Sequence, residues 1–282
     1  MDKTRRLAVL MTVGAALLWS TGGLFVKLLQ QDAFTILFYR SLFAAALFLV
    51  VFRQSLFRVN RLMIVSVLFY APLLIAFVTS TKLTTAANAI FLQYTAPAYV
   101  LLLEPYFIRT KLTRINVLTV TACFIGMVLF FVEQFTAPDN WAGIFLAAAN
   151  GLILAGLLIS QKMNKPEYQP GAVFFGNILV CLITLPWFVS GPSISATDVG
   201  YLLFLGIGQL GLGFVLFLYG QKHLPALESS LIAMLEPLLN PVWVFIGYGE
   251  KPGYWAILGG VVIMTSLVIR MILLEKKQVA SG

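Results

Sequence analysis

Charge is what this sequence has least of. Only 11% of its 282 residues are charged, while 60% are hydrophobic and the mean hydropathy is +0.93. Soluble domains carry roughly 25% charged residues. The composition therefore excludes an ordinary soluble domain and predicts an all-α protein that spans a membrane several times.

Side chains that support catalysis or metal binding are also scarce. The chain has one histidine, His223, and two cysteines, Cys123 and Cys181, which both lie inside apolar runs and are expected to be small packing residues. No P-loop is present. We therefore predict a protein that is not an enzyme and that uses no cofactor and no metal.

Long apolar runs are abundant. A helix needs about 20 residues to cross roughly 30 Å of hydrocarbon. Ten runs meet this requirement, and we predict ten transmembrane helices: Leu7–Leu29, Ala33–Phe52, Leu62–Thr81, Thr85–Phe107, Ile115–Val132, Trp141–Gln161, Pro170–Val189, Val199–Gly220, Ala226–Gly247 and Gly253–Leu273.

Basic residues concentrate in alternate loops. The net charge is +8, and 15 of the 19 Lys and Arg residues lie at Lys3, Arg5, Arg6, Arg53, Arg58, Arg61, Arg109, Lys111, Arg114, Lys162, Lys165, Lys222, Arg270, Lys276 and Lys277. In a soluble protein such a charge would suggest nucleic-acid binding. Here the positive-inside rule explains it, and predicts that both termini are cytoplasmic in the inner (plasma) membrane.

The two halves of the chain resemble each other. Lys82 and Pro97 fall on Lys222 and Pro237, each 140 positions later. A repeat of five spans is odd in number, so the second copy enters the membrane in the opposite orientation, as in alternating-access carriers. We predict a 5+5 inverted repeat, with the first unit at residues 1–135 and the second at residues 136–282.

The ninth run carries an acidic residue near its middle. Glu236 is followed by Pro237 and then by Pro241, and each proline frees the backbone carbonyl four residues earlier. Buried carboxyls in membranes are costly and usually functional. Glu236 is expected to carry a proton or bind a cationic group of the substrate. The alternative is a protonated carboxyl that only holds the helix break.

Arg40 is the other charge at membrane depth. It lies about two turns beyond Asp32 in the second run, and arginine keeps its charge. The favoured interpretation is a side chain that reaches outward to the membrane surface. The alternative is an anion site for a substrate carboxylate.

Several short motifs resemble those of the drug/metabolite transporter superfamily, in particular its ten-helix EamA-type permeases. These are Leu18–Gly23 in the first run, Phe38–Ser41 in the second, and Leu235–Pro237 with Gly247–Glu250 in the ninth. The resemblance implies a central cavity lined by the first, third, fourth, sixth, eighth and ninth helices. It also implies export of amino acids or other small metabolites, or transport of sugars and nucleotide sugars.

Polar and aromatic residues inside these runs are the candidate ligands of a small-molecule substrate. The predicted substrate-binding residues are Trp19, Ser20, Tyr70, Asn88, Gln93, Tyr94, Asn150, Gln209, Glu236 and Asn240. We predict a secondary carrier that exports a small, amphipathic or aromatic metabolite, with Glu236 as the candidate for proton coupling. A sugar or nucleoside carrier of the same fold is the main alternative, and a passive channel or a membrane enzyme is less favoured.

Overall fold

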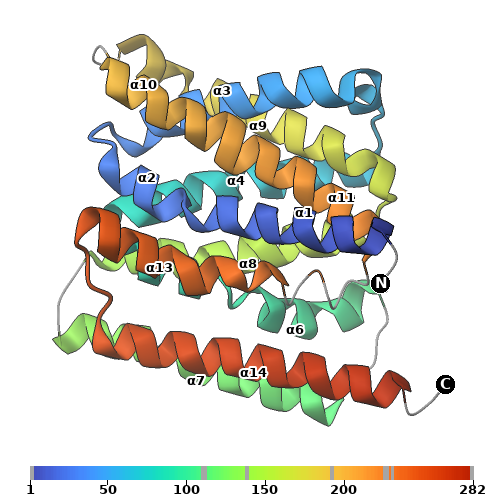
Figure 1. Cartoon of the computed structure of the whole chain (residues 1–282). Helices are drawn as coiled ribbons and strands as arrows, with labels where there is room; N and C mark the ends of the chain where they lie inside the picture. The colour runs from blue at the N-terminus through green and yellow to red at the C-terminus, as the bar shows by residue number, and fades with distance from the viewer. Residues whose placement is uncertain are drawn as a thin grey trace.

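Long helices that lie side by side form the whole of the regular structure described (Figure 1). The computed structural model describes residues 3–108, 113–136, 140–190, 194–224, 229 and 232–279. The main helices are α1 (Lys3–Ser20), α2 (Gly22–Leu28), α3 (Ala33–Phe52), α4 (Arg61–Leu83), α5 (Ala86–Gln93), α6 (Ala96–Ile108), α7 (Arg114–Thr136), α8 (Trp141–Lys162), α9 (Gln169–Ser190), α10 (Ala196–Leu203), η3 (Phe204–Leu212), α11 (Gly213–His223), α13 (Leu235–Tyr248) and α14 (Tyr254–Val279). Two short 3₁₀ turns, η1 (Arg53–Phe57) and η2 (Pro166–Tyr168), precede α4 and α9.

These helices correspond to the predicted runs and confirm an all-α membrane protein. Seven helical segments of the described chain are long and apolar enough to cross a bilayer, and α7 and α14 contain shorter apolar stretches. The ninth run is represented by α13 and by helical residues just before it. Arg109 and Lys111 of one predicted basic loop, and residues 226–228 of the ninth run, lie outside the described residues.

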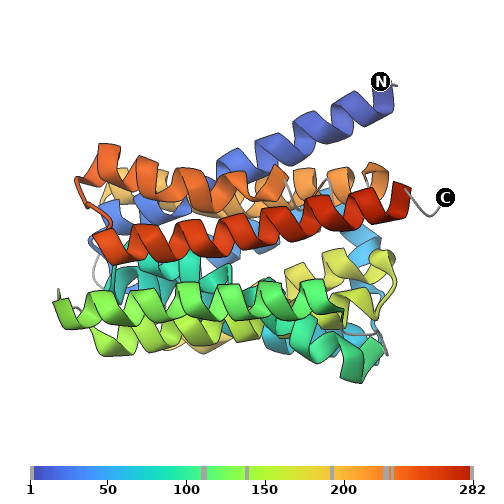
Figure 2. The same cartoon turned by 90° about the horizontal axis from the view of Figure 1, so that it is seen from below.

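Both chain ends lie at the same end of the bundle, as two perpendicular views show (Figures 1 and 2). We call this the terminal end and the opposite one the distal end. The distal end contains the α2–α3, α4–α5 and α13–α14 connections. This position of the two ends agrees with the predicted even number of spans, because each pair of spans returns the chain to the side on which it began.

The outer surface of the bundle is apolar, while small residues bring the helices together inside. Leu10, Leu118 and Ile246 are each 67–70% exposed, as suits side chains that face lipid. In α8, a methyl group added at Gly151 would lie 2.8 Å from the Leu92 carbonyl oxygen of α5. A small residue at this position therefore allows the two helices to pack closely.

The contacts between helices are symmetric: each contact described here is unchanged, or has a counterpart, when each helix is replaced by its equivalent in the other half. The helix five spans later is α14 for α7 and α9 for α3, and each of these pairs lies in contact. The contact of α4 with α8 has its counterpart in the contact of α11 with α1. Figure 1 shows α7 and α14 running together along one edge of the bundle. Residues from both halves therefore meet in the middle.

Four spans are irregular near the middle of the membrane. The first breaks at Thr21 and the fourth at Tyr94–Thr95, and the ninth turns at Met234 before α13 begins. The eighth contains the π-helical stretch η3. The break beside Pro237 was predicted, and Pro97 accounts for the break in the fourth span in the same way, because proline cannot donate the helical hydrogen bond. The break at Thr21 was not predicted, and the first run is two helices rather than one.

Candidate functional site

Glu236 lies in the first turn of α13, where the chain restarts as a helix. The Tyr94 hydroxyl lies 3.0 Å from Glu236 Oε2 and 3.2 Å from the Ala233 carbonyl oxygen. Ala233 is four residues before Pro237, so this is the carbonyl that the proline leaves without its helical donor. The helix N-terminus also favours a negative charge at Glu236. Tyr94 therefore joins the break in the fourth span to the break in the ninth.

Gln93 is the neighbour of Tyr94 at the same break, and it contacts the sixth span. The Asn150 amide of α8 donates through Nδ2 to Gln93 Oε1 at 2.8 Å. Asn150 is fully buried, and its Oδ1 atom has no hydrogen-bond partner among the described residues. Two predicted residues from different halves of the chain are thus brought into direct contact.

Gln209 occupies the π-helical stretch of the eighth span. It accepts a hydrogen bond from Arg40 Nη2 at 2.9 Å and donates through Nε2 to the Trp19 carbonyl at 3.2 Å. The π geometry lets η3 approach α3 closely: a methyl group added at Gly206 would lie 2.7 Å from the Arg40 carbonyl. The first, second and eighth spans therefore meet at one buried amide.

Ser20 and Asn240 connect the first span to the ninth. The indole of Trp243 in α13 donates to Ser20 Oγ at 2.9 Å. Asn240, one turn earlier in α13, is fully buried against Gly23. Neither the amide nitrogen nor the amide oxygen of Asn240 has a partner among the described residues. A buried polar atom without a partner costs about 1–3 kcal/mol, so these groups are suited to a ligand that arrives later.

Arg40 is buried, and the prediction that its side chain reaches outward was wrong. The residue is 3% exposed. No ion pair between Arg40 and Glu236 is formed in the described structure. The reason for the error is local. Gln209 of a neighbouring helix offers an inward partner, and the sequence spacing within α3 carries no information about it.

Two predicted residues, Tyr70 and Asn88, form hydrogen bonds with residues outside the predicted set. Tyr70 is fully buried in α4, where its hydroxyl accepts from Asn177 Nδ2 at 3.2 Å and its ring contacts Phe214. Asn88 lies in the first turn of α5, and its Nδ2 donates to Thr84 Oγ1 at 3.0 Å. Asn88 is therefore close to the distal end, about one turn and a half from Tyr94. Sequence reasoning placed both in the substrate site.

The residues that do come together form what we call the central polar group. It consists of Trp19, Ser20, Arg40, Gln93, Tyr94, Asn150, Gln209, Glu236, Asn240 and Trp243. Trp19 adds an aromatic wall, since its ring contacts Phe214 and Phe217 at 5.1 and 4.9 Å between centroids. Arg40 was predicted as an anion site only in the less favoured of two interpretations, and Trp243 was not among the predicted ligands. Trp243 could have been found, because it shares a helical face with Glu236 and Asn240.

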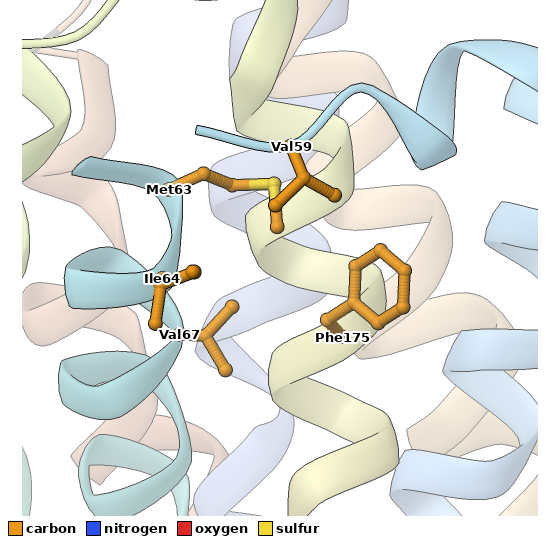
Figure 3. Close-up of a pocket in the computed structure, with 5 residues that line it drawn as sticks. All are labelled: Val59, Met63, Ile64, Val67 and Phe175. Carbon is orange, nitrogen blue, oxygen red and sulfur yellow. The ribbon is translucent and has the colours of Figure 1, made fainter. Parts of the chain in front are cut away.

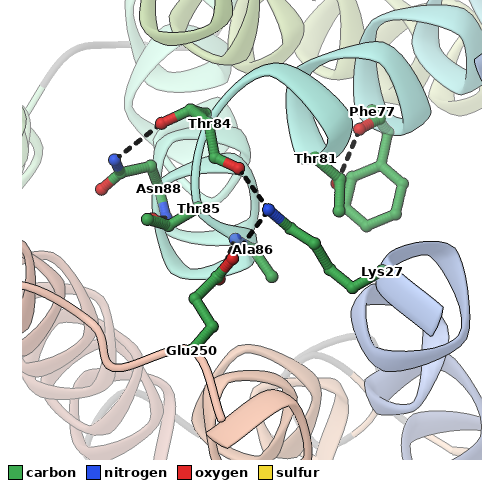
Figure 4. Close-up of polar contacts among 8 residues, drawn as sticks. All are labelled: Lys27, Phe77, Thr81, Thr84, Thr85, Ala86, Asn88 and Glu250. Atoms are coloured by element: carbon green, nitrogen blue, oxygen red, sulfur yellow. Dashed lines mark hydrogen bonds and ion pairs between the residues drawn. The ribbon is translucent and has the colours of Figure 1, made fainter. Parts of the chain in front are cut away.

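A cluster of charged contacts closes the distal end of the bundle (Figure 4). Lys27 Nζ lies 2.7 Å from Glu250 Oε2 and donates to the Thr84 carbonyl at 2.7 Å, while Glu250 Oε1 accepts from the Ala86 amide at 2.8 Å. Gly249, which ends α13 with a left-handed φ of 79°, turns the chain so that Glu250 can reach α5. We call Lys27, Glu250 and the two backbone groups the distal latch.

An apolar pocket of about 240 Å³ lies elsewhere, between α4 and α9 (Figure 3). It is lined by Val59, Met63, Ile64, Val67 and Phe175. None of these side chains offers a strong hydrogen bond or a charge. The pocket contains no member of the central polar group.

The described residues contain no group of three or more His, Cys, Asp or Glu side chains that could hold a metal ion. Cys123 and Cys181 are both buried and are not bonded to each other. The chemistry available at the central polar group is therefore hydrogen bonding, charge pairing and proton transfer at Glu236.

Comparison with known proteins gives a consistent picture. The profile of the EamA-like transporter family matches residues 6–132 and 141–272. Two proteins of Archaeoglobus fulgidus, each described as an uncharacterized transporter, are 24% identical to this chain over 256 and 271 residues. Each alignment covers 90% of this chain and 93% of the relative.

A third relative and one solved structure extend the comparison. The uncharacterized transporter YxxF of Bacillus subtilis is 26% identical over 194 residues, which are 67% of this chain and 62% of that protein. A solved structure described as "Crystal structure of protein" has a TM-score of 0.67 at 19% identity and covers 95% of this chain and 98% of its own. At this identity the structural likeness concerns the fold alone.

Proposed function

Because the chain belongs to the EamA-like transporter family, we propose that it is a secondary carrier that moves a small metabolite across the cytoplasmic membrane by alternating access. Family membership and the names of the relatives place it among transporters and not among enzymes. The two matched segments suggest units at residues 1–135 and 136–282, with the substrate bound where they meet. We propose that both termini are cytoplasmic.

The observation that carries this proposal is the contact between Tyr94 and Glu236. It joins two helix breaks from opposite halves, and a carboxyl group lies at the junction. Irregular backbone at membrane depth is found where protein or a ligand cavity satisfies the freed groups, and it is common at carrier substrate sites. A rigid scaffold would need neither the breaks nor the charge.

Alternating access requires each end of the bundle to open in turn. The distal latch joins α2 to the start of α5 and to the α13–α14 connection, so it crosses the boundary between the halves. The other end of α5 carries Gln93, and Tyr94 follows directly. One eight-residue helix therefore links the distal latch to the central polar group. Opening the distal end would free the helix that holds Glu236 in place.

The lining favours a solute that is partly apolar. The central polar group contains amides and aromatic rings, and Trp19 packs on Phe214 and Phe217. Arg40 is the sole buried Lys or Arg among the residues described, which disfavours phosphorylated sugars. We propose a small amphipathic metabolite such as an amino acid, moved outward, with Glu236 as the proton-coupling residue. A sugar or nucleoside remains the alternative substrate of the same site.

The test is counterflow in proteoliposomes, after a thermal-shift screen of amino acids, amines, purines and sugars has identified a solute that stabilises the protein. A carrier gives saturable uptake that is accelerated by the same solute on the far side. Unsaturable flux without this acceleration would indicate a channel instead.

The role of Glu236 is tested in the same assay. Glu236→Gln keeps the shape of the side chain but cannot exchange a proton. We expect it to remove the pH dependence of uptake between about pH 5.5 and 8. Glu167→Gln, at an exposed position, is the matched control. A Glu236→Gln protein whose uptake follows pH as the wild type does would exclude proton coupling at this residue.

A further inference from the structure

Arg40 carries hydrogen-bond donors that the protein does not use. Its side chain is 3% exposed, and one bond, from Nη2 to Gln209 Oε1, is its side-chain contact in the described structure. The Nε and Nη1 atoms are buried and have no partner among the described residues. A guanidinium has five N–H donors in a planar fork and cannot lose its charge in a protein.

This arrangement is costly unless an anion completes it. Removing a charge from water costs several kcal/mol per ion, and the cost is offset only by good pairing with an opposite charge. Gln209 is neutral, and it is held in turn by the Trp19 carbonyl. No ion pair joins Arg40 to Glu236 among the described residues. The structure thus places a permanent cation within the candidate site, with part of its fork unpaired.

We propose that Arg40 is the anion-binding residue of the site and that its open donors bind a carboxylate group of the transported solute. The inference rests on the proposed carrier function and adds the chemical class of the substrate. Two parallel N–H···O bonds from one guanidinium to one carboxylate are the favoured geometry of such pairs. A doubly charged phosphate is disfavoured, because the described part of the interior offers it one cation and the nearby carboxyl of Glu236.

Gln209 positions Arg40 for this task. It binds Nη2 from the π-helical stretch and is anchored to the first span, so it fixes one arm of the fork. The first and eighth spans would therefore sense whether Arg40 is occupied. A purely structural Arg40, which only braces α3 against η3, would not discriminate between a carboxylate and a neutral isostere.

The experiment measures thermal unfolding of the full-length protein in detergent with matched probes. The probes are L-phenylalanine, 3-phenylpropionate and benzoate, each compared with its carboxamide. We expect at least one carboxylate to raise the unfolding temperature saturably while its carboxamide does not. If no carboxylate stabilises the protein, or if the carboxamides do so equally well, the proposal is wrong.

Three variants distinguish a loss of carboxylate binding from a loss of folding. Arg40→Lys keeps the charge but loses the planar fork, and we expect carboxylate affinity to fall about tenfold or more. Arg40→Met should abolish binding. Arg58→Lys, at the exposed terminal end, should bind as the wild type does. Unchanged affinity in Arg40→Lys and Arg40→Met would overturn the proposal, and gel filtration verifies that each variant is folded.

Failure of this inference is distinguishable from failure of the carrier function. If counterflow is observed for a solute without an acidic group and is insensitive to Arg40→Met, the carrier function stands and the carboxylate site falls. If carboxylates bind through Arg40 but no counterflow is detected, the carboxylate site is supported and the proposed carrier function is wrong.

Discussion

At the distal end, Lys27 and Glu250 are 2.7 Å apart and their side chains are only 12% and 16% exposed. At the terminal end, Arg58 and Glu167 are 3.4 Å apart, and their side chains are 59% and 46% exposed. Exposed ion pairs stabilise proteins by about 0–1 kcal/mol, whereas removing one partner of a buried pair costs far more. The same kind of contact therefore has different consequences at the two ends.

The distal end is also held by more polar contacts than the terminal end. The distal latch also binds the Ala86 amide and the Thr84 carbonyl, and the Lys82 side chain contacts the Leu29 carbonyl nearby. At the terminal end, besides the exposed ion pair, Asn60 and Asn164 exchange amide hydrogen bonds. With both termini cytoplasmic, as we propose, the distal end is the outer end, and it is held by more buried contacts than the terminal end.

The largest effect on the difference between the two ends is expected from Lys27→Glu. Two carboxylates would then face each other at a mostly buried position, and the distal end should open. We expect a cysteine introduced as Thr81→Cys, with Cys123 and Cys181 replaced by alanine, to react about tenfold faster with an impermeant maleimide from the distal side. Arg58→Glu, which places a like-charge pair at the terminal end, should leave this rate unchanged.

The charge swap is the control for that variant. Lys27→Glu combined with Glu250→Lys restores opposite charges, so labelling of the introduced cysteine should return toward the original rate. If the swap stays as reactive as the single variant, the ion pair is not what closes this end.

Glu250→Gln should have a smaller effect. The amide can still accept from the Ala86 N–H, so only the charge opposite Lys27 is lost. We expect a loss of about 1–3 kcal/mol, measured as a lower unfolding temperature in detergent. A loss as small as that of Arg58→Ala would show that the two ends are held equally.

Tyr94→Phe tests whether the central polar group and the distal latch are linked through α5. The variant removes the hydroxyl that contacts Glu236 and Ala233, at a cost of about 1 kcal/mol. Maleimide labelling at position 81 should rise slightly, because one of the contacts that hold this end of α5 is then lost. Unchanged labelling together with reduced thermal stability would mean that the middle and the distal end are independent.

Arg58→Ala should have the smallest effect. The side chain is mostly solvated and its contact with Glu167 is long, so the expected loss is about 0–1 kcal/mol. A drop in unfolding temperature larger than that of Glu250→Gln would reverse the comparison between the ends.

The fold could be predicted because its causes are local along the chain. The run Ala33–Phe52 coincides with α3, since hydrophobic length alone defines a spanning helix. Pro237 predicted both the break before α13 and the free carbonyl of Ala233, because proline removes a hydrogen bond within its own helix. Thr21 was missed as a break, since Gly22 and Gly23 permit an interruption without requiring one.

The site was harder to predict because its contacts join distant residues. Tyr94 and Glu236 were both named as candidates, but they are 142 positions apart and nothing in the sequence pairs them. Arg40 was expected to face outward because its partner lies 169 positions away. Glu250 was noted only as part of a motif, and its pairing with Lys27 required the packing of α2 against α13.

The most direct test asks from which side the central polar group can be reached. In the background without Cys123 and Cys181, Ser20→Cys places a thiol at the break in the first span. We predict that an impermeant maleimide labels it from the terminal side, and that adding Lys27→Glu shifts labelling toward the distal side. A thiol that reacts equally from both sides with and without Lys27→Glu, or from neither, would contradict a carrier with alternating access.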